Sequence, residues 1–277
     1  MPAQVRTVQM PGGRALAFAE SGRPDGFPVI YHHGTPGSRL EQWPDRPTLA
    51  QLGVRLVTFD RPGCGRSDPL EGRTLLDVAA DVERLADHLG LERFAVSGMS
   101  GGAPYVLATA YALRDRVNRA AISCAAGPLD RPGALEGMTP AQVEELELAR
   151  NDPDRLGEFF DQLDVGASMP EEELSAFGSI PGLPEVMLLS VREATRQGWG
   201  GVIADDLCLV GPWGFPLEEV NVPVWLWHGD RDKLAPLHHA SYIADRVSSA
   251  QLNICRGEGH IDMFRHQEEV LGILAGG

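Results

Sequence analysis

The chain has 277 residues, 43% of them hydrophobic, which is enough for one large globular core or two smaller ones. Its 39 acidic and 24 basic side chains give a formal net charge of −15. This balance argues against a nucleic-acid partner, because such binding requires clustered lysines and arginines, and against docking on an anionic membrane surface.

No stretch approaches about 18 uninterrupted apolar residues, so we expect no transmembrane segment. The first 19 residues lack an apolar stretch behind a basic start, so we expect no secretory signal. The four cysteines are far apart and form no CxxC pair, which is typical of reduced thiols in a cytoplasmic protein. Cys64 and Cys124 are interpreted as small core residues.

The N-terminal half begins with strand patterns. Residues 5–8 and 15–19 predict an antiparallel hairpin around Gly12-Gly13. Residues 28–32 (PVIYH) and 55–59 (RLVTF) are rich in β-branched and aromatic side chains, which is typical of buried strands.

Strands and helices then alternate. Residues 74–89 carry apolar side chains at helical spacing, and Thr74 with Asp77 forms a capping-box pattern at the start. Residues 93–97 (RFAVS) predict a strand, and residues 100–113 predict a helix rich in small side chains.

Further strands are predicted at residues 120–124, 223–227 and 249–255, followed by a final helix over 263–274. Such alternation predicts an α/β fold: a mostly parallel sheet with helices on both faces. Between the strands at 120–124 and 223–227 the sequence has only helical patches, which indicates an inserted helical cap. We therefore predict a core of residues 1–127 and 219–277 and a cap of residues 128–218.

A candidate nucleophile follows the strand at 93–97. The sequence Gly98-Met99-Ser100-Gly101-Gly102 has the G-x-S-x-G pattern between a strand and a helix, where a sharp turn exposes the serine hydroxyl. Side chains at the outer glycines would collide with the crossing strand and helix. A serine that only caps the helix is the alternative interpretation.

A serine hydroxyl needs a base, and eight histidines compete for that role. His260 lies in a Gly-rich loop after the last strand and could reach across the edge of the sheet. Four others are expected at the surface: His88, His238, His239 and His266. The remaining three are at the ends of strands: His32, His33 and His228.

The acid that orients the histidine should follow a strand and precede the histidine. The segment His228-Gly229-Asp230-Arg231-Asp232 offers two carboxylates, and the spacing favours Asp232 over Asp230. Both could instead be simple turn-forming residues. The order Ser100, Asp232, His260 is the one expected for a triad of this type.

Stabilisation of negative charge is predicted in the loop His33-Gly34-Thr35-Pro36-Gly37, which follows the strand at 28–32. Pro36 has no N–H, so the backbone N–H groups of Thr35 and Gly101 are the predicted oxyanion hole. Read alone, this segment would be an ordinary turn.

Four motifs together resemble the α/β-hydrolase superfamily over nearly the whole chain: HGTPG (33–37), DRPGCGRSD (60–68), GMSGG (98–102) and GEGH (257–260). The second resembles a loop of capped members, such as proline iminopeptidase-like and ester-cleaving hydrolases. Thr35 replaces the second glycine of the HGGPG form usual in proline iminopeptidases, which weakens that reading. Serine rather than aspartate at position 100 argues against dehalogenase or epoxide hydrolase chemistry.

Residues of the cap and of the turn around the serine are predicted to line a substrate pocket: Met99, Phe159, Met187, Trp199 and Trp213. Asp205-Asp206 could hold a substrate amine, but we expect a solvated pair. His228, Asp230, Asp232, His238 and His239 do not have the spacing of a metal site, and no phosphate or dinucleotide motif occurs. No metal and no cofactor is therefore expected.

The resemblance and the residues together predict a cofactor-independent serine hydrolase whose partner is a small-molecule ester or lactone. Two alternatives stay open. One is an aminopeptidase of the proline iminopeptidase type, and the other is a ligand-sensing receptor that keeps the triad for slow turnover. The sequence does not indicate an oligomeric state.

Overall fold

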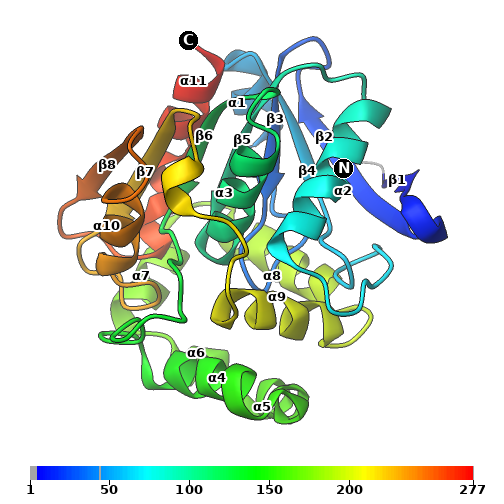
Figure 1. Ribbon diagram of the computed structural model, residues 1–277. Coiled ribbons are helices and arrows are strands. Elements are labelled where there is room, and N and C mark those ends of the chain that lie inside the picture. Colours follow the sequence, from blue (N-terminus) through cyan, green and yellow to red (C-terminus); the bar gives the residue numbers. More distant parts are fainter. Residues whose placement is uncertain (1–4, 44, 277) are drawn as a thin grey trace.

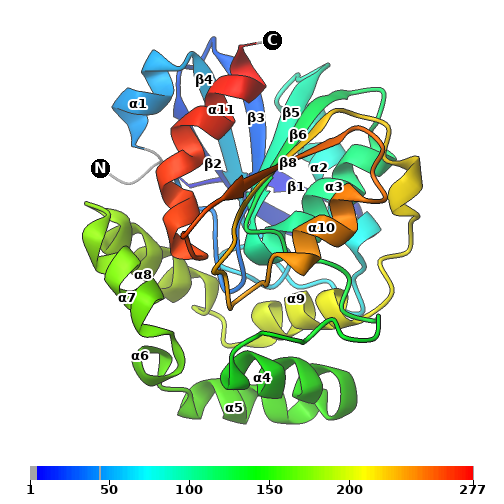
Figure 2. The same cartoon turned by 90° about the vertical axis from the view of Figure 1, so that its left-hand side faces the viewer.

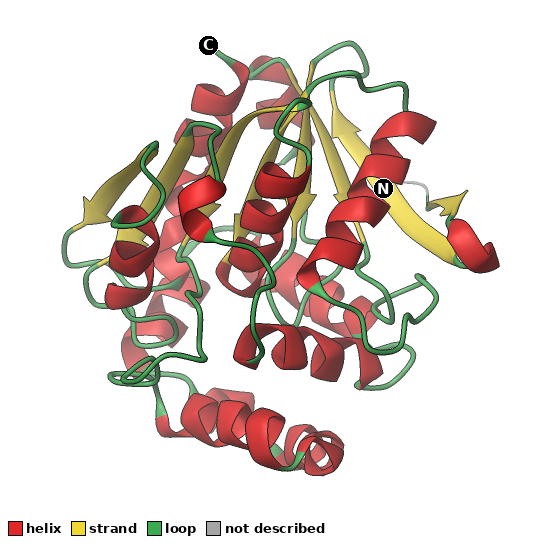
Figure 3. Ribbon diagram, viewed as in Figure 1, coloured by secondary structure: helices red, strands yellow, loops and turns green. Residues whose placement is uncertain are grey.

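The computed structural model describes residues 5–43 and 45–276. Within them the strands form one sheet in the order β1-β2-β4-β3-β5-β6-β7-β8, with helices on both faces (Figures 1 and 3). Only the pairs β1–β2 and β2–β4 are antiparallel. The prediction of a mostly parallel sheet is therefore confirmed. The strand bounds are β1 (Arg6–Gln9), β2 (Ala15–Gly22), β3 (Phe27–His32), β4 (Val54–Phe59), β5 (Phe94–Met99), β6 (Val117–Ser123), β7 (Val224–Gly229) and β8 (Ala250–Cys255).

Central strands are buried on both sides, as their continuous apolar sequences require. Every residue of β5 is buried, whereas β8 at the edge of the sheet has no fully buried residue. The central position of β5 matters for function because the candidate nucleophile Ser100 follows it directly.

Two apolar layers cover the sheet. On one face α2 (Leu75–His88), α3 (Ala103–Ala112) and α10 (His238–Ala244) pack into one core cluster. On the other face α1 (Arg46–Gln51) and α11 (Gln267–Ala275) pack into a second (Figure 2). The predicted capping box begins α2: the Asp77 N–H donates to Thr74 Oγ1 at 3.2 Å, and the Thr74 N–H donates to Asp77 Oδ2 at 2.8 Å.

Two predicted helices begin with a tighter 3₁₀ segment. The segment η2 (Ser100–Gly102) precedes α3, and η5 (Ile261–His266) precedes α11. Both follow residues of the candidate site, where the chain turns sharply from a strand or a loop into a helix. Hydrophobic periodicity alone does not distinguish these first turns from α-helix.

Between β6 and β7 the chain forms a helical insertion beyond the carboxyl ends of the parallel strands (Figure 1). Its segments are α4 (Pro140–Asn151), η3 (Pro153–Arg155), α5 (Leu156–Gln162), α6 (Val165–Ser168), α7 (Glu171–Ser179), α8 (Leu183–Ala194) and α9 (Gly200–Val210), and η4 (Leu217–Glu219) leads back to β7. The predicted cap boundary after residue 127 lies in the loop before α4. The boundary after residue 218 lies inside η4.

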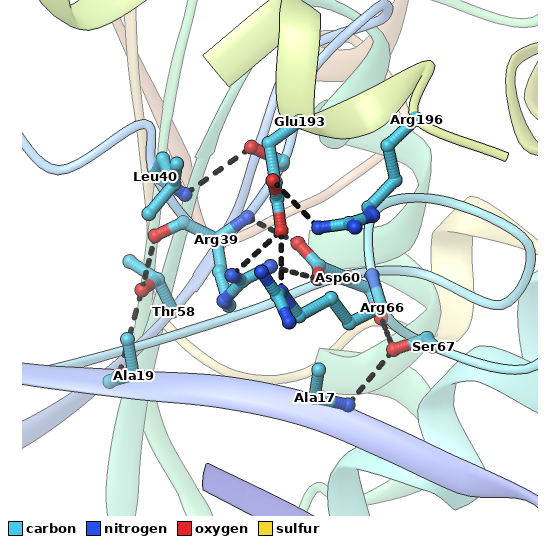
Figure 4. Close-up of polar contacts among 12 residues, drawn as sticks. Ala17, Ala19, Arg39, Leu40, Thr58, Asp60, Arg66, Ser67, Glu193 and Arg196 are labelled. Carbon is cyan, nitrogen blue, oxygen red and sulfur yellow. Dashed lines mark hydrogen bonds and ion pairs between the residues drawn. The ribbon is translucent and has the colours of Figure 1, made fainter. Parts of the chain in front are cut away.

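Ion pairs join this insertion to the core loops. Arg39, in the loop after β3, contacts Asp60 after β4 and donates to Glu193 of α8 at 2.8 Å (Figure 4). Arg66 donates to the same Glu193 oxygen at 3.0 Å. The cap helix α8 is thus held over two loops that also frame the candidate site.

Among the described helices, none is by itself long and apolar enough to cross a membrane. Only α7 and α8 taken together meet that length and composition, and a bend of 109° separates them.

Candidate active site

The candidate site lies where the strand order reverses, between β3 and β5. Parallel strands that diverge from this point leave a crevice at their carboxyl ends. The loop after β3 and the turn after β5 meet there: a Cβ placed on Gly101 would lie 2.5 Å from Thr35 Oγ1, and one on Gly34 would lie 3.8 Å from Ser100 Cβ. The structure therefore brings together the predicted nucleophile and the predicted oxyanion loop.

Ser100 occupies a strained turn. Its φ of 51° lies in the left-handed region that residues with a side chain rarely adopt. The flanking glycines permit the close crossing, because a Cβ on Gly98 would lie 2.8 Å from the His32 carbonyl oxygen and one on Gly102 would lie 2.4 Å from it. The turn leaves Ser100 facing the cavity described below.

Asp232 and His260 form a buried pair. The two atoms His260 Nδ1 and Asp232 Oδ2 are 2.7 Å apart. The other carboxylate oxygen accepts the N–H groups of Leu234 and Ala235, each at 2.8 Å, which fixes the orientation of Asp232. Asp230 instead accepts the N–H of Gly257 at 2.7 Å, so of the two candidate acids Asp232 is the one against His260.

Nearby charges shift the pKa values of both His260 and Asp232. Burial alone would lower the pKa of His260, but the Asp232 carboxylate and Cys124, through their charges and hydrogen bonds, together outweigh burial and hold the pKa well above 6.5. Burial would likewise raise the pKa of Asp232, whereas His260 and the hydrogen bonds to its oxygens keep it below the ordinary value. Asp232 is therefore ionised at neutral pH and stabilises a charged imidazole.

Cys124 lies between His260 and Ser100. Burial raises the pKa of the Cys124 thiol, and hydrogen bonding to the His260 imidazole and to the Ser100 backbone opposes this rise. Cys124 is fully buried, in agreement with its interpretation as a core residue. The His260 imidazole and the Ser100 backbone share this neighbour, and among the described residues no hydrogen bond joins the Ser100 hydroxyl to the imidazole. Such contacts are often loose in unliganded sites and tighten around substrate.

Other buried histidines are held in the neutral form. His33 Nδ1 donates to the Gly34 carbonyl at 2.7 Å, Nε2 accepts the Arg61 N–H, and burial lowers the His33 pKa to about 3. His239, which we expected at the surface, is completely buried, so that prediction is wrong. Its Nε2 contacts the Ala134 carbonyl at 2.6 Å because α10 packs against the loop after β6, and burial lowers its pKa to about 4.

To bind an oxyanion, the predicted donor N–H groups must not already be used in hydrogen bonds within the protein. The Gly34 N–H is already used, since it donates to Glu41 at 3.1 Å. In the described part of the chain, the Thr35 N–H donates to no other group of the protein. Gly101 lies in the first turn of η2, where N–H groups have no partner within the helix. Arg61 holds the loop in place by donating to the His33 carbonyl at 2.6 Å and to the Gly34 carbonyl at 2.9 Å. The donors are thus set in advance, as stabilisation of developing charge requires.

Asp205 and Asp206 of α9 are both buried, so the prediction of a solvated pair is wrong. Asp205 Oδ2 lies 2.6 Å from Arg61, and Asp205 Oδ1 lies 2.5 Å from Arg73. Although burial opposes it, these two guanidinium groups hold the pKa of Asp205 far below its usual range. Packing of α9 onto the core arginines, which no local pattern reveals, is the physical reason.

A cavity of about 50 Å³ adjoins Ser100. Apolar and small side chains from α4, α9 and the loop after β6 form much of it, together with Glu145 and Asp206. Burial raises the pKa of Glu145 to about 7 and that of Asp206 well above its usual value, which favours the protonated form of both carboxyl groups. The lining residues are Thr35, Ser100, Gly101, Ala126, Leu129, Met138, Gln142, Glu145, Leu146, Asp206, Leu209, Leu234, Ala235 and His239.

None of the five residues predicted to bind substrate lines this cavity. Met99 and Met187 pack in the core layer of α1 and α11, and Trp213 is buried beside Phe215. Trp199 and Phe159 pack around Phe160 within the cap. A larger hollow of about 380 Å³ does include Phe159, but it lies in the cap and contains none of Ser100, Asp232 and His260. The aromatic side chains stabilise the cap, and smaller ones surround Ser100.

Sequence reasoning missed Glu145, Glu173 and the place of Cys124. Glu173 of α7 accepts the backbone N–H of His260 at 2.7 Å. In the sequence, Glu173 is one of three consecutive glutamates, a pattern typical of an exposed helix start. Only the burial of that helix on the histidine loop distinguishes it.

The metal group that we weighed in the sequence does not assemble. Among the described residues, the one cluster with suitable ligand atoms is Cys255, Glu258 and His266, whose atoms lie within 4.8 Å of one another. His266 and Glu258 already pair at 2.6 Å. The absence of a metal and of a cofactor from the reaction stays a prediction.

Residues 28–267 match a family model described as the alpha/beta hydrolase fold. A proline iminopeptidase from Neisseria gonorrhoeae is 34% identical over 158 residues, which span 52% of this chain and 50% of that protein. The match thus reaches about half the length of that relative.

Two solved structures share the fold over nearly their whole length. A thermophilic esterase from Thermogutta terrifontis superposes with a TM-score of 0.68 at 24% identity, covering 98% of this chain and 96% of the other. An enol-lactonase from Burkholderia xenovorans LB400 gives a TM-score of 0.69 at 17% identity and covers 97% of both chains. At these identities the similarity establishes the fold alone.

Proposed function

The chain belongs to the α/β-hydrolase family, and on that basis we propose that it is a serine hydrolase that cleaves a carboxylic ester or lactone of a small molecule. The observation that carries the proposal is the buried Asp232–His260 pair at 2.7 Å, set beside a serine in a strained turn. Thr35 and Gly101, whose backbone N–H groups are the proposed oxyanion donors, line the cavity beside Ser100. These are the parts that acyl transfer through a serine requires.

In the proposed mechanism Ser100 Oγ attacks the substrate carbonyl carbon while His260 Nε2 takes the hydroxyl proton. Asp232 holds Nδ1–H and stabilises the imidazolium, and the Thr35 and Gly101 amides bind the oxyanion. The imidazolium then gives its proton to the leaving alkoxide, which departs and leaves an acyl group on Ser100. Water, deprotonated by His260, attacks the acyl carbon and releases the carboxylic acid and the free serine.

An ester or a lactone suits the site for two reasons. The space beside Ser100 is small, about 50 Å³, so it admits a compact acyl group unless the cap moves. Such a substrate also needs no charged pocket for an amine. The same fold occurs in a protein named as an esterase and in one named as an enol-lactonase.

Substitution of the nucleophile tests the proposal. We expect Ser100→Ala to lower turnover of a small ester by roughly a millionfold, because triad members act as a unit, and to abolish covalent labelling by a fluorophosphonate. Ser241→Ala, in a half-buried position of α10, is the matched control and should label like the unaltered protein. Labelling that persists in the Ser100→Ala protein would contradict the assignment.

A second candidate, an aminopeptidase, is favoured by one observation. Glu145 and Asp206 place two carboxyl groups in the cavity beside Ser100, and a substrate ammonium group could bind there with release of their shared proton. The proline iminopeptidase is also a sequence relative over half its length. A small ester and an N-terminal prolyl amide, assayed side by side, separate the two functions. Faster turnover of the amide, lost in Glu145→Gln while ester turnover persists, would favour the peptidase.

A further inference from the structure

A cap residue reaches the backbone of the candidate base. Glu173 lies in the first turn of α7 and is only 2% exposed, whereas its neighbours Glu171 and Glu172 are exposed. Its Oε1 accepts the N–H of His260 at 2.7 Å, and its Oε2 accepts the N–H of Ile261 at 2.8 Å. Both oxygens of this buried carboxyl group therefore bind the segment that carries the imidazole.

These two N–H groups need an acceptor from elsewhere in the chain. His260 directly precedes η5, and the first N–H groups of any helical segment have no partner within it. His260 is the N-cap residue of η5, and its own side chain makes no capping hydrogen bond. Glu173, 87 residues earlier in the sequence, supplies the acceptor that a local Ser, Thr or Asp supplies at most helix starts.

The loop before His260 approaches Glu173 too closely for a side chain at position 259. A Cβ on Gly259 would lie 2.4 Å from Glu173 Oε1, so the loop before His260 can touch the carboxylate only because residue 259 is glycine. Apolar packing surrounds the contact: Ala176 of α7 and Ile180, which directly follows α7, share a core cluster with Ile261. The helix therefore keeps a contact with η5 when the carboxylate is removed.

We propose that Glu173 is a positioning residue that sets the backbone of His260 and thereby couples the docking of the cap helix α7 to the alignment of the triad. The inference rests on the proposed function of Ser100, Asp232 and His260. The imidazole is then fixed from two sides, by Asp232 of the core on its ring and by Glu173 of the cap on its backbone. Release of either contact lets the ring turn away from Ser100.

A positioning role has a distinctive kinetic signature. Glu173 does not line the cavity beside Ser100, so its loss should lower the rate of the chemical step and leave substrate affinity unchanged. A merely structural role would instead lower stability and the fraction of active protein, with the same rate constant for every folded molecule.

The test compares Glu173→Ala, Glu173→Gln and the exposed control Glu172→Ala in the full chain. Each protein reacts with a fluorophosphonate, and the maximal labelling rate and half-saturating concentration are measured together with the folded fraction. For Glu173→Ala we expect a maximal rate about 10- to 100-fold lower per folded molecule, because two buried N–H groups lose their acceptor. The half-saturating concentration should not change, and Glu172→Ala should match the unaltered protein.

Glu173→Gln keeps one carbonyl oxygen as acceptor, so we expect an intermediate rate, and this variant decides the question if the alanine variant does not fold. The inference is overturned if folded Glu173→Ala labels at a rate within about twofold of the unaltered protein. Where the alanine variant is unfolded, the same rate in folded Glu173→Gln overturns it.

The Ser100→Ala protein separates this failure from that of the proposed function. If Ser100→Ala still labels, the triad assignment fails, whereas if it is inert only the role of Glu173 is refuted.

Discussion

At the scale of single residues, burial and charge decide which groups can react. His33 and His239 are buried and form no ion pair with a carboxylate of the described residues, and burial lowers their pKa values to about 3 and about 4. His260 is buried just as deeply, but Asp232 reverses the effect of burial and raises its pKa. Among these histidines, only His260 combines a carboxylate partner with a place beside Ser100.

The pH dependence of activity follows from this shift. A general base must be neutral, so kcat/KM should rise with pH through the pKa of His260 in the folded protein. Because Asp232 holds that pKa above 6.5, we expect an acid limb whose midpoint lies above pH 6.5. The stabilising effect of the charged pair is complete below about pH 6.5 and is lost as pH rises through the folded pKa.

A profile of kcat/KM against pH for a small ester checks this prediction, with the titration of unfolding as a companion measurement. Asp232→Asn removes the charge that raises the His260 pKa, so its residual activity should show an acid limb at lower pH. An acid limb below pH 6.5 in the unaltered protein would show that the Asp232 charge does not control the base.

At the scale of elements, sharp turns after strands carry the chemistry. The turn from β5 into α3 presents Ser100, and the loop after β8 presents His260. In both places a close contact excludes a side chain: the His32 carbonyl at Gly98 and Gly102, and the Glu173 carboxylate at Gly259. The need for glycine at these positions arises from the local geometry, and hydrophobic periodicity does not reveal it.

Gly102→Ala tests the crossing of the nucleophile turn with the loop after β3. The added Cβ would lie 2.4 Å from the His32 carbonyl oxygen and 2.8 Å from that of His33, and both are backbone atoms with little freedom to move. We expect a loss of about 1–3 kcal/mol in the free energy of unfolding, together with a lower labelling rate at Ser100.

Gly157→Ala is the matched control for urea denaturation of this variant. It lies in α5, no atom stands within 4 Å of its added Cβ, and a helical Gly→Ala change stabilises by roughly 0.5–1 kcal/mol. Equal stability of Gly102→Ala and the unaltered protein would show that the turn relaxes without strain.

At the scale of the whole molecule, buried charges hold the cap on the core. Asp205 of α9 joins Arg61 and Arg73, which lie at the two ends of the core loop between β4 and α2, and all three side chains are fully buried. The same contacts brace the loop that carries Thr35, whose hydroxyl donates to Asp205 at 3.2 Å. The Asp205 carboxylate therefore contributes both to the position of the cap and to that of the loop with the predicted oxyanion donor Thr35.

Substitution of the adjacent residues Asp205 and Asp206 by asparagine is expected to change the free energy of unfolding by very different amounts. Asp205→Asn leaves two buried guanidinium groups without a counter-charge, so we expect a loss of about 3–5 kcal/mol in the free energy of unfolding at neutral pH. Burial raises the pKa of Asp206 and so favours its neutral form, and Asp206→Asn should therefore cost much less than Asp205→Asn. Urea denaturation at pH 7 measures both, and equal effects of the two substitutions would contradict the charge assignment.

The amino-acid sequence by itself determined the alternation of strands and helices, the family motifs and the identity of the residues at the ends of the strands. These follow from local chemistry: side-chain spacing marks each element, and a glycine-flanked serine after a strand marks a sharp turn. Even the choice of Asp232 over Asp230, which the structure places against His260, depends on a short spacing within one loop.

Only the tertiary structure decided how the cap meets the core. Asp206 and Glu173 have the sequence context of solvated side chains, yet one lines the cavity and the other holds the histidine loop. The aromatic residues that we expected around the substrate instead pack in the core and within the cap. These outcomes depend on contacts between residues far apart in the chain, where the burial of a charge is set by a partner that no local pattern contains.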